Sequence, residues 1–374
     1  MAKINVRSPY YVYYNLNGLT EAQVSLYIYS GTQGSRPTTP TYVLNARAVN
    51  FTVNFEIAEL VKDYMTYIAD DLETEIVWVD YQIRRTVNGV SGFLPFVELK
   101  GFYGYGYFEQ GVNPQNDSGL LQSNLTVVKL DDAPVVLPID TSKVTSVQYY
   151  SENQEVYGQN FAPTTTSSTQ IQYVSNTVNG TDEFADRVYR DGGTFEGSIC
   201  LNQFLDSNVT FPVDTIYINS DDGVSVVKVD NITECKYDTY KLSFINKYGA
   251  LQNLWFFKRS NKQLSTKAED FKRNTLSANS YDVDKHQKKN LYKMGNEKMD
   301  LNTGFYPEEY NEVFKQMQLS EDCWIEIDNI VLPVNVTDSS FSYKTSLNDK
   351  LINYTIKIDF AFDDVTADST FNKL

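Results

Sequence analysis

Short stretches that alternate apolar with polar residues recur along the chain, and they constrain its fold more than any other feature. Residues 22–29 (Ala-Gln-Val-Ser-Leu-Tyr-Ile-Tyr) alternate in this way, and between 351 and 362 every second residue is Ile, Tyr or Phe. Successive side chains of a strand point to opposite faces, so this period predicts half-buried strands. The 28 Tyr and 21 Phe residues favour strands too. We therefore predict a mainly β, antiparallel architecture with a few amphipathic helices.

The first 133 residues are predicted to form a small β-sandwich domain that carries one helix. Apolar residues recur at helical spacing from Ile57 to Ile68, which predicts an amphipathic helix. Asn88-Gly89 predicts a hairpin turn, because both residues tolerate positive φ. The polar sequence that begins at Asp131 ends the domain.

Residues 134–374 are predicted to form a second β-rich domain. The Thr- and Ser-rich segment 151–170 has too few apolar residues to pack, so it is expected to be a linker or long loop. Residues 111–124 are expected to be an exposed loop. A helix is predicted to begin at Pro307. Pro333 predicts that its strand lies at a sheet edge or contains a bulge.

Charge is distributed very unevenly along the chain. The net charge is −16. Residues 258–293 hold ten basic and four acidic residues, a balance of +6, so the other residues together carry −22. Large apolar residues are sparse in this segment, and such a segment rarely supports a core of its own. We therefore predict that residues 258–294 form an extended basic arm, or a long hairpin, that rests on another surface.

An arm on an acidic body can pair with the acidic face of a neighbouring copy. Each exposed ion pair contributes only about 0–1 kcal/mol, so apolar anchors are needed as well. The predicted docking residues of the arm combine both types of side chain: Lys262, Lys267, Lys272, Arg273, Leu276, Tyr281, Lys288, Lys289 and Leu291. DNA contact is a competing use, but Lys dominates over Arg and no aromatic ladder accompanies it, so specific base recognition is not expected.

Residues able to perform catalysis are scarce. His286 is the one histidine; it lies in the basic segment and is expected to be a solvated surface residue. Cys200, Cys235 and Cys323 are too far apart for a zinc site and are expected to be buried single thiols. We therefore predict no catalytic residue, no metal site and no bound cofactor, and the protein is not expected to be an enzyme.

Three further motifs have structural explanations. Gly101-Phe-Tyr-Gly-Tyr-Gly matches a nucleotide-binding turn only in its glycine content, and its tyrosines predict strand pairing. Asp70, Asp71, Glu73 and Glu75 are interpreted as a solvated helix exit, although paired carboxylates of glycan hydrolysis and a calcium loop remain alternatives. Asp221-Asp-Gly is interpreted as a hairpin turn.

Two rows of tyrosines leave a binding function open. Tyr10, Tyr11, Tyr13 and Tyr14, together with a second row that begins at Tyr103, could stack on sugars, although packing in the core or at an interface is favoured. A carbohydrate- or receptor-binding β module of a phage tail, similar to an adhesin or fibre, is therefore the alternative function. A structural assembly protein accounts for more features: two β blocks, long polar segments and a basic arm. No apolar run is long enough for a membrane helix, and no N-terminal signal core is visible.

Two segments carry a family resemblance. The first is Phe244-Ile-Asn-Lys-Tyr-Gly-Ala-Leu-Gln-Asn-Leu-Trp-Phe-Phe-Lys, within residues 231–262. The second, residues 295–362, includes Leu301-Asn-Thr-Gly-Phe-Tyr, Trp324-Ile-Glu-Ile and Ser342-Tyr-Lys-Thr-Ser-Leu. These sequences resemble virion structural proteins of tailed bacteriophages, in particular neck and tail ring proteins of crAss-like podophages that infect Bacteroidota.

This resemblance implies a homo-oligomeric ring, twelvefold or sixfold, that stacks below the portal and forms part of the channel for genomic DNA. It implies a sandwich or split-barrel, tail-tube-like domain from residue 134 onwards, with an arm that reaches a neighbouring subunit or ring. The partners implied are other copies of the chain, the portal and adjoining neck and tail proteins, with non-specific passage of DNA during ejection. The implied location is the virion, after synthesis in the host cytoplasm, with no membrane contact.

Overall fold

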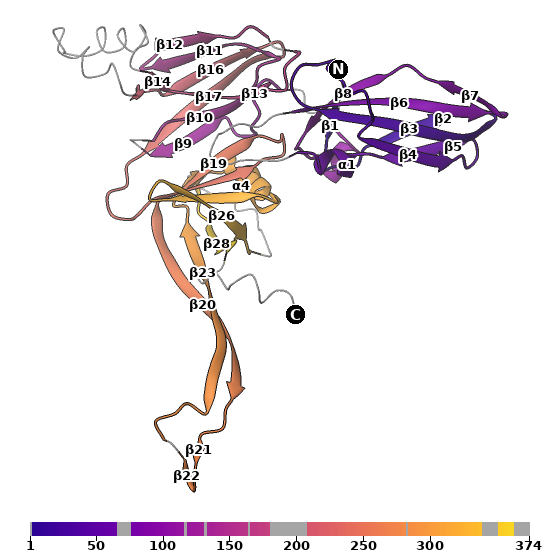
Figure 1. Cartoon of the computed structure of the whole chain (residues 1–374). Coiled ribbons are helices and arrows are strands. Elements are labelled where there is room, and N and C mark those ends of the chain that lie inside the picture. Colours follow the sequence, from indigo (N-terminus) through magenta and orange to yellow (C-terminus); the bar gives the residue numbers. More distant parts are fainter. Residues whose placement is uncertain are drawn as a thin grey trace. The chain divides into compact units, whose positions relative to one another are not determined.

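A computed structural model gives the structure of the protein (Figure 1). It confirms the mainly β, antiparallel fold and divides the chain into two compact units. Unit 1 comprises Met1–Thr233, Ser243–Leu254 and Glu309–Ser320; unit 2 comprises Glu234–Leu242, Trp255–Glu308 and Glu321–Leu374. The boundary predicted at residue 133 falls inside unit 1, and packing of the sheets into a sandwich or split barrel stays a prediction. The residues that the structure describes are 2–65, 76–115, 118–130, 133–163, 165–179, 208–281, 283–338 and 351–362.

The first sheet of unit 1 is built from the alternating strands of the N-terminal segment. Its order is β1-β8-β6-β3-β4, and β7 pairs with β6. Val24, Leu26 and Ile28 are buried on one face of β3, as the alternation predicts. Asn88 and Gly89 adopt φ values of 49° and 81°, which confirms the predicted hairpin turn. The strands are β1 (Ala2–Asn5), β3 (Leu19–Tyr29), β4 (Tyr42–Arg47), β6 (Val77–Val87), β7 (Val90–Phe93) and β8 (Val97–Phe102).

A two-stranded sheet and a short helix accompany the first sheet. β2 (Tyr11–Asn15) pairs with β5 (Thr52–Glu56), and α1 (Ala58–Lys62) follows directly. The predicted helix from Ile57 to Ile68 is therefore too long. The backbone N–H groups of Tyr64 and Met65 bond to carbonyls three residues back, so the helix ends in tighter turns, and residues 66–75 lie outside the described residues.

The glycine–tyrosine motif is a strand only in its first two residues: Gly101 and Phe102 pair within β8, as predicted, but Tyr103 to Gly106 do not form a strand. β8 ends at Phe102, and the chain then bonds irregularly: the Tyr105 N–H donates to the carbonyl of Lys247 at 2.9 Å, and a 3-10 turn, η1 (Phe108–Gln110), follows. A Cβ atom at Gly104 would lie 2.6 Å from the same Lys247 carbonyl oxygen. The glycine is therefore required by the close approach of two backbones, and not by a nucleotide.

We expect Gly104→Ala to lower the free energy of unfolding by about 1–3 kcal/mol, because the added methyl group has to displace backbone atoms. The matched control is Gly92→Ala, where a Cβ meets nothing within 4 Å. Urea unfolding of the two variants measures the difference. Equal stability of the two variants would contradict the close approach.

The second part of unit 1 centres on a five-stranded sheet of order β12-β11-β16-β17-β9. Val147, Tyr149, Ile216 and Ile218 fill its core, each with 0% exposure. This part of unit 1 also contains two small two-stranded sheets, β10-β13 and β14-β15. The strands are β9 (Thr126–Leu130), β10 (Val136–Asp140), β11 (Val144–Ser151), β12 (Gln154–Asn160), β13 (Ile171–Ser175), β14 (Thr177–Asn179), β15 (Asn208–Thr210), β16 (Thr215–Ser220) and β17 (Gly223–Ile232).

Two segments that were predicted to be loops contain ordered, buried structure. Segment 151–170 includes all of β12, and its Ser168 is 1% exposed. The Ser168 hydroxyl accepts a hydrogen bond from the N–H of Gly31, and its own N–H donates to the Gly31 carbonyl. In segment 111–124, residues Leu120 and Leu121 are buried. The described residues of 111–124 form no helix or strand, as predicted, but their exposure was predicted wrongly, and segment 151–170 was wrongly predicted to be unpacked. Polar side chains here find backbone partners, which composition alone does not reveal.

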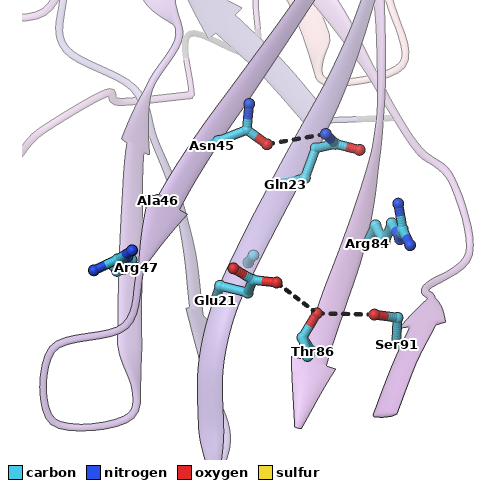
Figure 2. Close-up of a pocket in the computed structure, with 9 residues that line it drawn as sticks. Glu21, Gln23, Asn45, Ala46, Arg47, Arg84, Thr86 and Ser91 are labelled. Carbon is cyan, nitrogen blue, oxygen red and sulfur yellow. Dashed lines mark hydrogen bonds between the residues drawn. The ribbon is translucent and has the colours of Figure 1, made fainter. Parts of the chain in front are cut away.

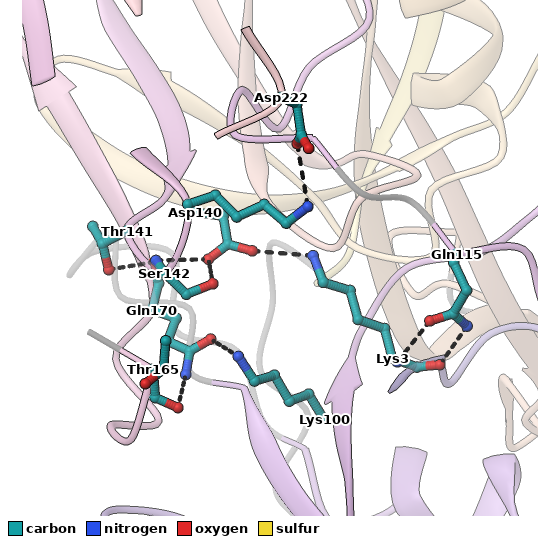
Figure 3. A network of polar contacts seen from close by, with 10 residues as sticks. Lys3, Lys100, Gln115, Asp140, Thr141, Ser142, Thr165, Gln170 and Asp222 are labelled. Atoms are coloured by element: carbon teal, nitrogen blue, oxygen red, sulfur yellow. Dashed lines mark hydrogen bonds and ion pairs between the residues drawn. The ribbon is translucent and has the colours of Figure 1, made fainter. Parts of the chain in front are cut away.

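A buried polar network links the N-terminal sheet to the second part of unit 1 (Figure 3). Lys3 of β1 forms an ion pair of 3.0 Å with Asp140 of β10, and their side chains are 7% and 0% exposed. Asp140 also accepts hydrogen bonds from the N–H and hydroxyl of Ser142. Lys100 of β8 donates to the Gln170 side chain at 2.8 Å. These bonds replace the hydrogen bonds to water that the charged groups of Lys3, Asp140 and Lys100 lose on burial.

Unit 1 also contains the second helix, α4 (Tyr310–Gln318). Its apolar face, formed by Val313, Phe314 and Met317, is fully buried, as the spacing predicts. The Tyr310 hydroxyl accepts a hydrogen bond from the N–H of Val128 at 2.8 Å. The predicted helix start at Pro307 is wrong: Pro307 pairs with Leu351 in a short strand, and this pairing delays the helix by three residues.

The main sheet of unit 2 has seven strands in the order β19-β18-β25-β26-β28-β23-β20. β18 and β19 each carry residues of both units. β26 pairs with two neighbours, so the predicted edge position of Pro333 is wrong. Pairing of β26 with β28 begins at Val334, so the missing N–H of Pro333 interrupts no bond there. The strands are β18 (Tyr240–Ile245), β19 (Leu251–Phe256), β20 (Lys258–Lys272), β23 (Lys288–Asn302), β25 (Cys323–Ile327), β26 (Ile330–Val336) and β28 (Thr355–Phe360).

The predicted C-terminal strand is present but interrupted. Ile352, Ile356 and Phe360 are buried, whereas Phe362 is 41% exposed and lies beyond the strand. The N–H of Tyr354 donates to the Thr303 hydroxyl at 2.9 Å, which separates β28 from a short strand before it. The remaining strands of unit 2 are β21 (Leu276–Ser277), β22 (Ser280–Tyr281), β24 (Tyr306–Pro307) and β27 (Leu351–Ile352).

Candidate functional site

The predicted basic arm, residues 258–294, forms most of a long antiparallel hairpin. β20 and β23 run as a two-stranded ribbon beyond the main sheet of unit 2, and β21 and β22 pair at its far end (Figure 1). Within β23, only Lys298–Asn302 pair with β28. The base of the hairpin is therefore part of a sheet, with Met299 and Leu301 buried. Farther out, the ribbon consists of two strands alone.

The side chains of the outer ribbon are exposed on both faces. Every residue of β20 from Asn261 to Lys272 is exposed, and so are the first six residues of β23. A two-stranded hairpin without a further packing layer is only marginally stable in water. The arm thus buries little of its own apolar surface and gains stability from any surface that covers it.

The ribbon contains a bulge close to its most basic part. Glu269 pairs with Tyr292, and Asp270 pairs with Asn290, which leaves Leu291 as an extra residue in β23. Leu291 is 59% exposed. The hydrogen bond from the Tyr292 hydroxyl to Glu269 raises the pKa of Tyr292. The bulge therefore presents an apolar side chain close to the carboxylates of Glu269 and Asp270.

Like charges face each other beyond the bulge. Lys272 pairs with Lys288, and the preceding pair is Phe271 with Lys289. Directly opposed like charges destabilise a sheet, so this arrangement does not stabilise the hairpin. No described residue forms an ion pair with any of the arm lysines that were predicted to dock: Lys262, Lys267, Lys272, Lys288 and Lys289.

All nine predicted docking residues lie on the outer ribbon or its tip, and all are exposed. The three predicted apolar anchors are among the more exposed apolar residues: Leu276 is 54%, Tyr281 69% and Leu291 59% exposed. Whether they contact a partner stays a prediction. Their shared position on one hairpin is compatible with a single docking surface.

Sequence reasoning missed four further apolar side chains of the arm. Phe271 and Tyr292 are 42% and 38% exposed, and their cross-strand pairs lie on either side of the Asp270–Asn290 pair at the bulge. Leu264 and Val283 are 61% and 90% exposed. For Leu264 and Phe271, the signal that could have identified them is that neither has an apolar residue two positions away in this charged segment.

Of the other candidates from the sequence, some are described individually and some lie outside the described residues. His286 is exposed, as predicted. Cys323 is buried, but Cys235 is exposed, contrary to the prediction, because it follows the end of β17 in a turn; Cys200 lies outside the described residues. Asp70, Asp71, Glu73 and Glu75 also lie outside the described residues. Among the described residues, no group of three metal-binding side chains occurs.

The turn is present as predicted, and the two tyrosine rows differ in burial. Asp222 lies in the predicted turn between β16 and β17 and forms an ion pair with Lys143. Tyr103 and Tyr105 are each 7% exposed, so they pack inward, whereas Tyr11 and Tyr13 are 53% and 62% exposed. Within the described part of the chain, no helix is long and apolar enough to cross a membrane.

Comparison with known proteins adds no family. No protein-family model matches this chain, and no curated protein matches it.

Proposed function

We propose that the protein is a structural component of a tailed-phage virion: a homo-oligomeric ring of the neck or tail, below the portal, whose basic arm docks on a neighbouring subunit. The observation that carries this proposal is the outer ribbon, with exposed cations and exposed apolar side chains on a two-stranded hairpin. The resemblance of residues 231–262 and 295–362 to ring proteins of crAss-like podophages supports it.

The charges suggest what the arm binds. Residues 258–293 carry +6, and the rest of the chain carries −22, so another copy of the chain offers an acidic surface. A single exposed ion pair contributes at most about 1 kcal/mol. Repetition of the contact around a closed ring adds these weak contributions together. Burial of Leu276, Tyr281 and Leu291 adds a hydrophobic contribution to the binding free energy.

The acidic balance also fits a channel for DNA. Carboxylates along a channel repel phosphate groups, so the duplex passes without binding. In this proposal the portal and adjoining neck and tail proteins are the other partners, and DNA passes through without sequence-specific contact. Neither catalysis nor a cofactor is part of the proposed function.

Light scattering and negative-stain imaging of the purified chain, alone and mixed with the portal protein of the same phage, test this function. Rings of the chain, or assembly that depends on the portal, are the expected result. A chain that stays monomeric at high concentration and does not bind the portal would contradict the proposal.

Charge reversal at the outer ribbon is expected to weaken assembly. In the triple variant Lys272→Glu, Lys288→Glu and Lys289→Glu, the arm is acidic where it contacts the partner, so the two surfaces repel each other. We expect self-association to be about 10- to 100-fold weaker, which is a loss of about 1.4–2.8 kcal/mol in the free energy of association. Sedimentation velocity at low salt measures the change. The matched control reverses three exposed lysines outside the arm: Lys228, Lys236 and Lys357. An equal effect of both variants would show that net charge, not the arm, drives association.

A further inference from the structure

The N-terminal sheet of unit 1 carries a polar hollow on its outer face, remote in sequence from the arm. The hollow has a volume of ≈ 290 Å³ and spans four adjacent strands, β4, β3, β6 and β7 (Figure 2). The opposite side chains of β3, such as Val24 and Leu26, fill the core. The residues that line the hollow therefore stand on a rigid, packed sheet.

Strand register arranges these side chains in two rows. Residues that pair across antiparallel strands lie on the same face, and neighbouring strands are about 4.8 Å apart, so a row of four side chains spans about 14 Å. The rows are about 7 Å apart, the length of two residues. One row is Arg47, Glu21, Thr86 and Ser91, and the other is Asn45, Gln23, Arg84 and Phe93.

The interior of the hollow offers hydrogen-bonding groups in both directions. Gln23 donates to the Asn45 side chain at 2.9 Å, which leaves the Gln23 carbonyl oxygen and the Asn45 amide nitrogen available. The Thr86 hydroxyl lies 3.3 Å from Glu21 and 3.0 Å from Ser91 (Figure 2). Amide, hydroxyl and carboxylate groups at this spacing suit a ligand rich in hydroxyl groups.

Two guanidinium groups flank this polar interior. Arg47 and Arg84 are both exposed, and neither forms an ion pair with a described residue, although Glu21 stands between them in the grid. The hollow therefore has a local balance of +1 on a chain of net charge −16. A guanidinium fork pairs with a carboxylate through two parallel hydrogen bonds.

An aromatic ring closes one end of the grid. Phe93 is 64% exposed, and the Arg84 guanidinium lies 5.8 Å from its ring centre. An exposed phenyl face packs well against the C–H face of a pyranose ring. Hydroxyl-binding groups, a carboxylate-binding fork and a flat apolar surface thus occur within about 14 Å, the length of two to three sugar rings.

We propose that this hollow, named here the Arg47–Arg84 hollow, binds an acidic saccharide, a short run of uronic-acid rings. Arg84 pairs with a sugar carboxylate, Phe93 packs against the same ring, and the amide and hydroxyl groups bind sugar hydroxyls. This binding is independent of the ring assembly proposed above, because it uses none of the arm residues.

Calorimetric titration of the full chain with trigalacturonate, and with the neutral galactotriose of the same linkage, tests the site. The expected result is saturable binding of trigalacturonate, at least tenfold weaker binding of the neutral sugar, and at least a tenfold loss in Arg84→Gln and in Phe93→Ala. Arg259→Gln, an exposed arginine of the arm, is the control and keeps full affinity. Circular dichroism shows that each variant is folded.

Three outcomes overturn the proposal. The first is no heat of binding with trigalacturonate at millimolar concentration. The second is binding that Arg84→Gln leaves unchanged. The third is equal binding of a triglutamate peptide, which would identify the hollow as a general anion surface and not a saccharide site. None of these outcomes depends on whether the chain assembles, which the sizing experiments measure separately.

Discussion

A variant with a shortened arm is expected to fold normally and to lose assembly. Ala268 and Lys293 pair directly across the ribbon, so a two-residue Asn-Gly turn can replace residues 269–292 and join them. The base of the hairpin, with the buried Met299 and Leu301, stays intact. We expect self-association to weaken at least 100-fold, about 2.7 kcal/mol or more, because the variant lacks Leu276, Tyr281, Leu291 and the opposed lysines.

Two measurements separate folding from docking in this variant. Urea unfolding is expected to give a free energy within about 1 kcal/mol of the parent chain, because the removed residues whose burial is described are exposed, with the exception of Thr275. Light scattering measures the loss of assembly. Assembly of the shortened chain at the affinity of the parent would exclude the arm as the docking element. A lower unfolding free energy would instead show that the ribbon stabilises unit 2.

Removal of the buried Lys3 charge is expected to have the largest effect on stability. In Lys3→Met, Asp140 keeps its bonds to Ser142 but loses its only cationic partner among the described residues, at 0% exposure. An uncompensated buried charge costs about 3–5 kcal/mol. Urea unfolding monitored by tryptophan fluorescence measures the loss, since Trp78 is fully buried in the neighbouring sheet.

The double variant Lys3→Met with Asp140→Leu is the informative control. Removal of both charges leaves no buried ion, so we expect it to recover a large part of the stability that the single variant loses. The less buried pair Lys143–Asp222, whose side chains are 17% and 47% exposed, offers a comparison: its loss is expected to change stability by about 1 kcal/mol or less. A single Lys3→Met variant as stable as the parent would contradict the buried pair.

The sequence predicts the strands of this protein well, because their alternation is a local property. The period of two around Val24 and Ile356 follows directly from burial of one sheet face. The arm is predictable for a different reason: ten basic residues with few large apolar neighbours cannot form a core. Both inferences use residues that are close together in the chain.

Long-range contacts account for the predictions that failed. Ser168 is buried because it bonds to Gly31, 137 residues away, and no local pattern reveals that partner. Pro307 pairs with Leu351 and so is excluded from the helix that its position suggested. The Arg47–Arg84 hollow was missed for the same reason, since its residues come from four strands that only the sheet order brings together.

The outer edge of β20 has a consequence for how copies of this chain can meet. β20 is the last strand of its sheet, so one side of a fifteen-residue strand exposes unbonded backbone groups. Such an edge can pair with the same edge of another copy and lead to aggregation, unless charged side chains repel the second edge. The lysines along β20 supply that repulsion between two arms brought side by side. In the proposed assembly, the charge that attracts the arm to an acidic neighbour would also keep arms from pairing with one another.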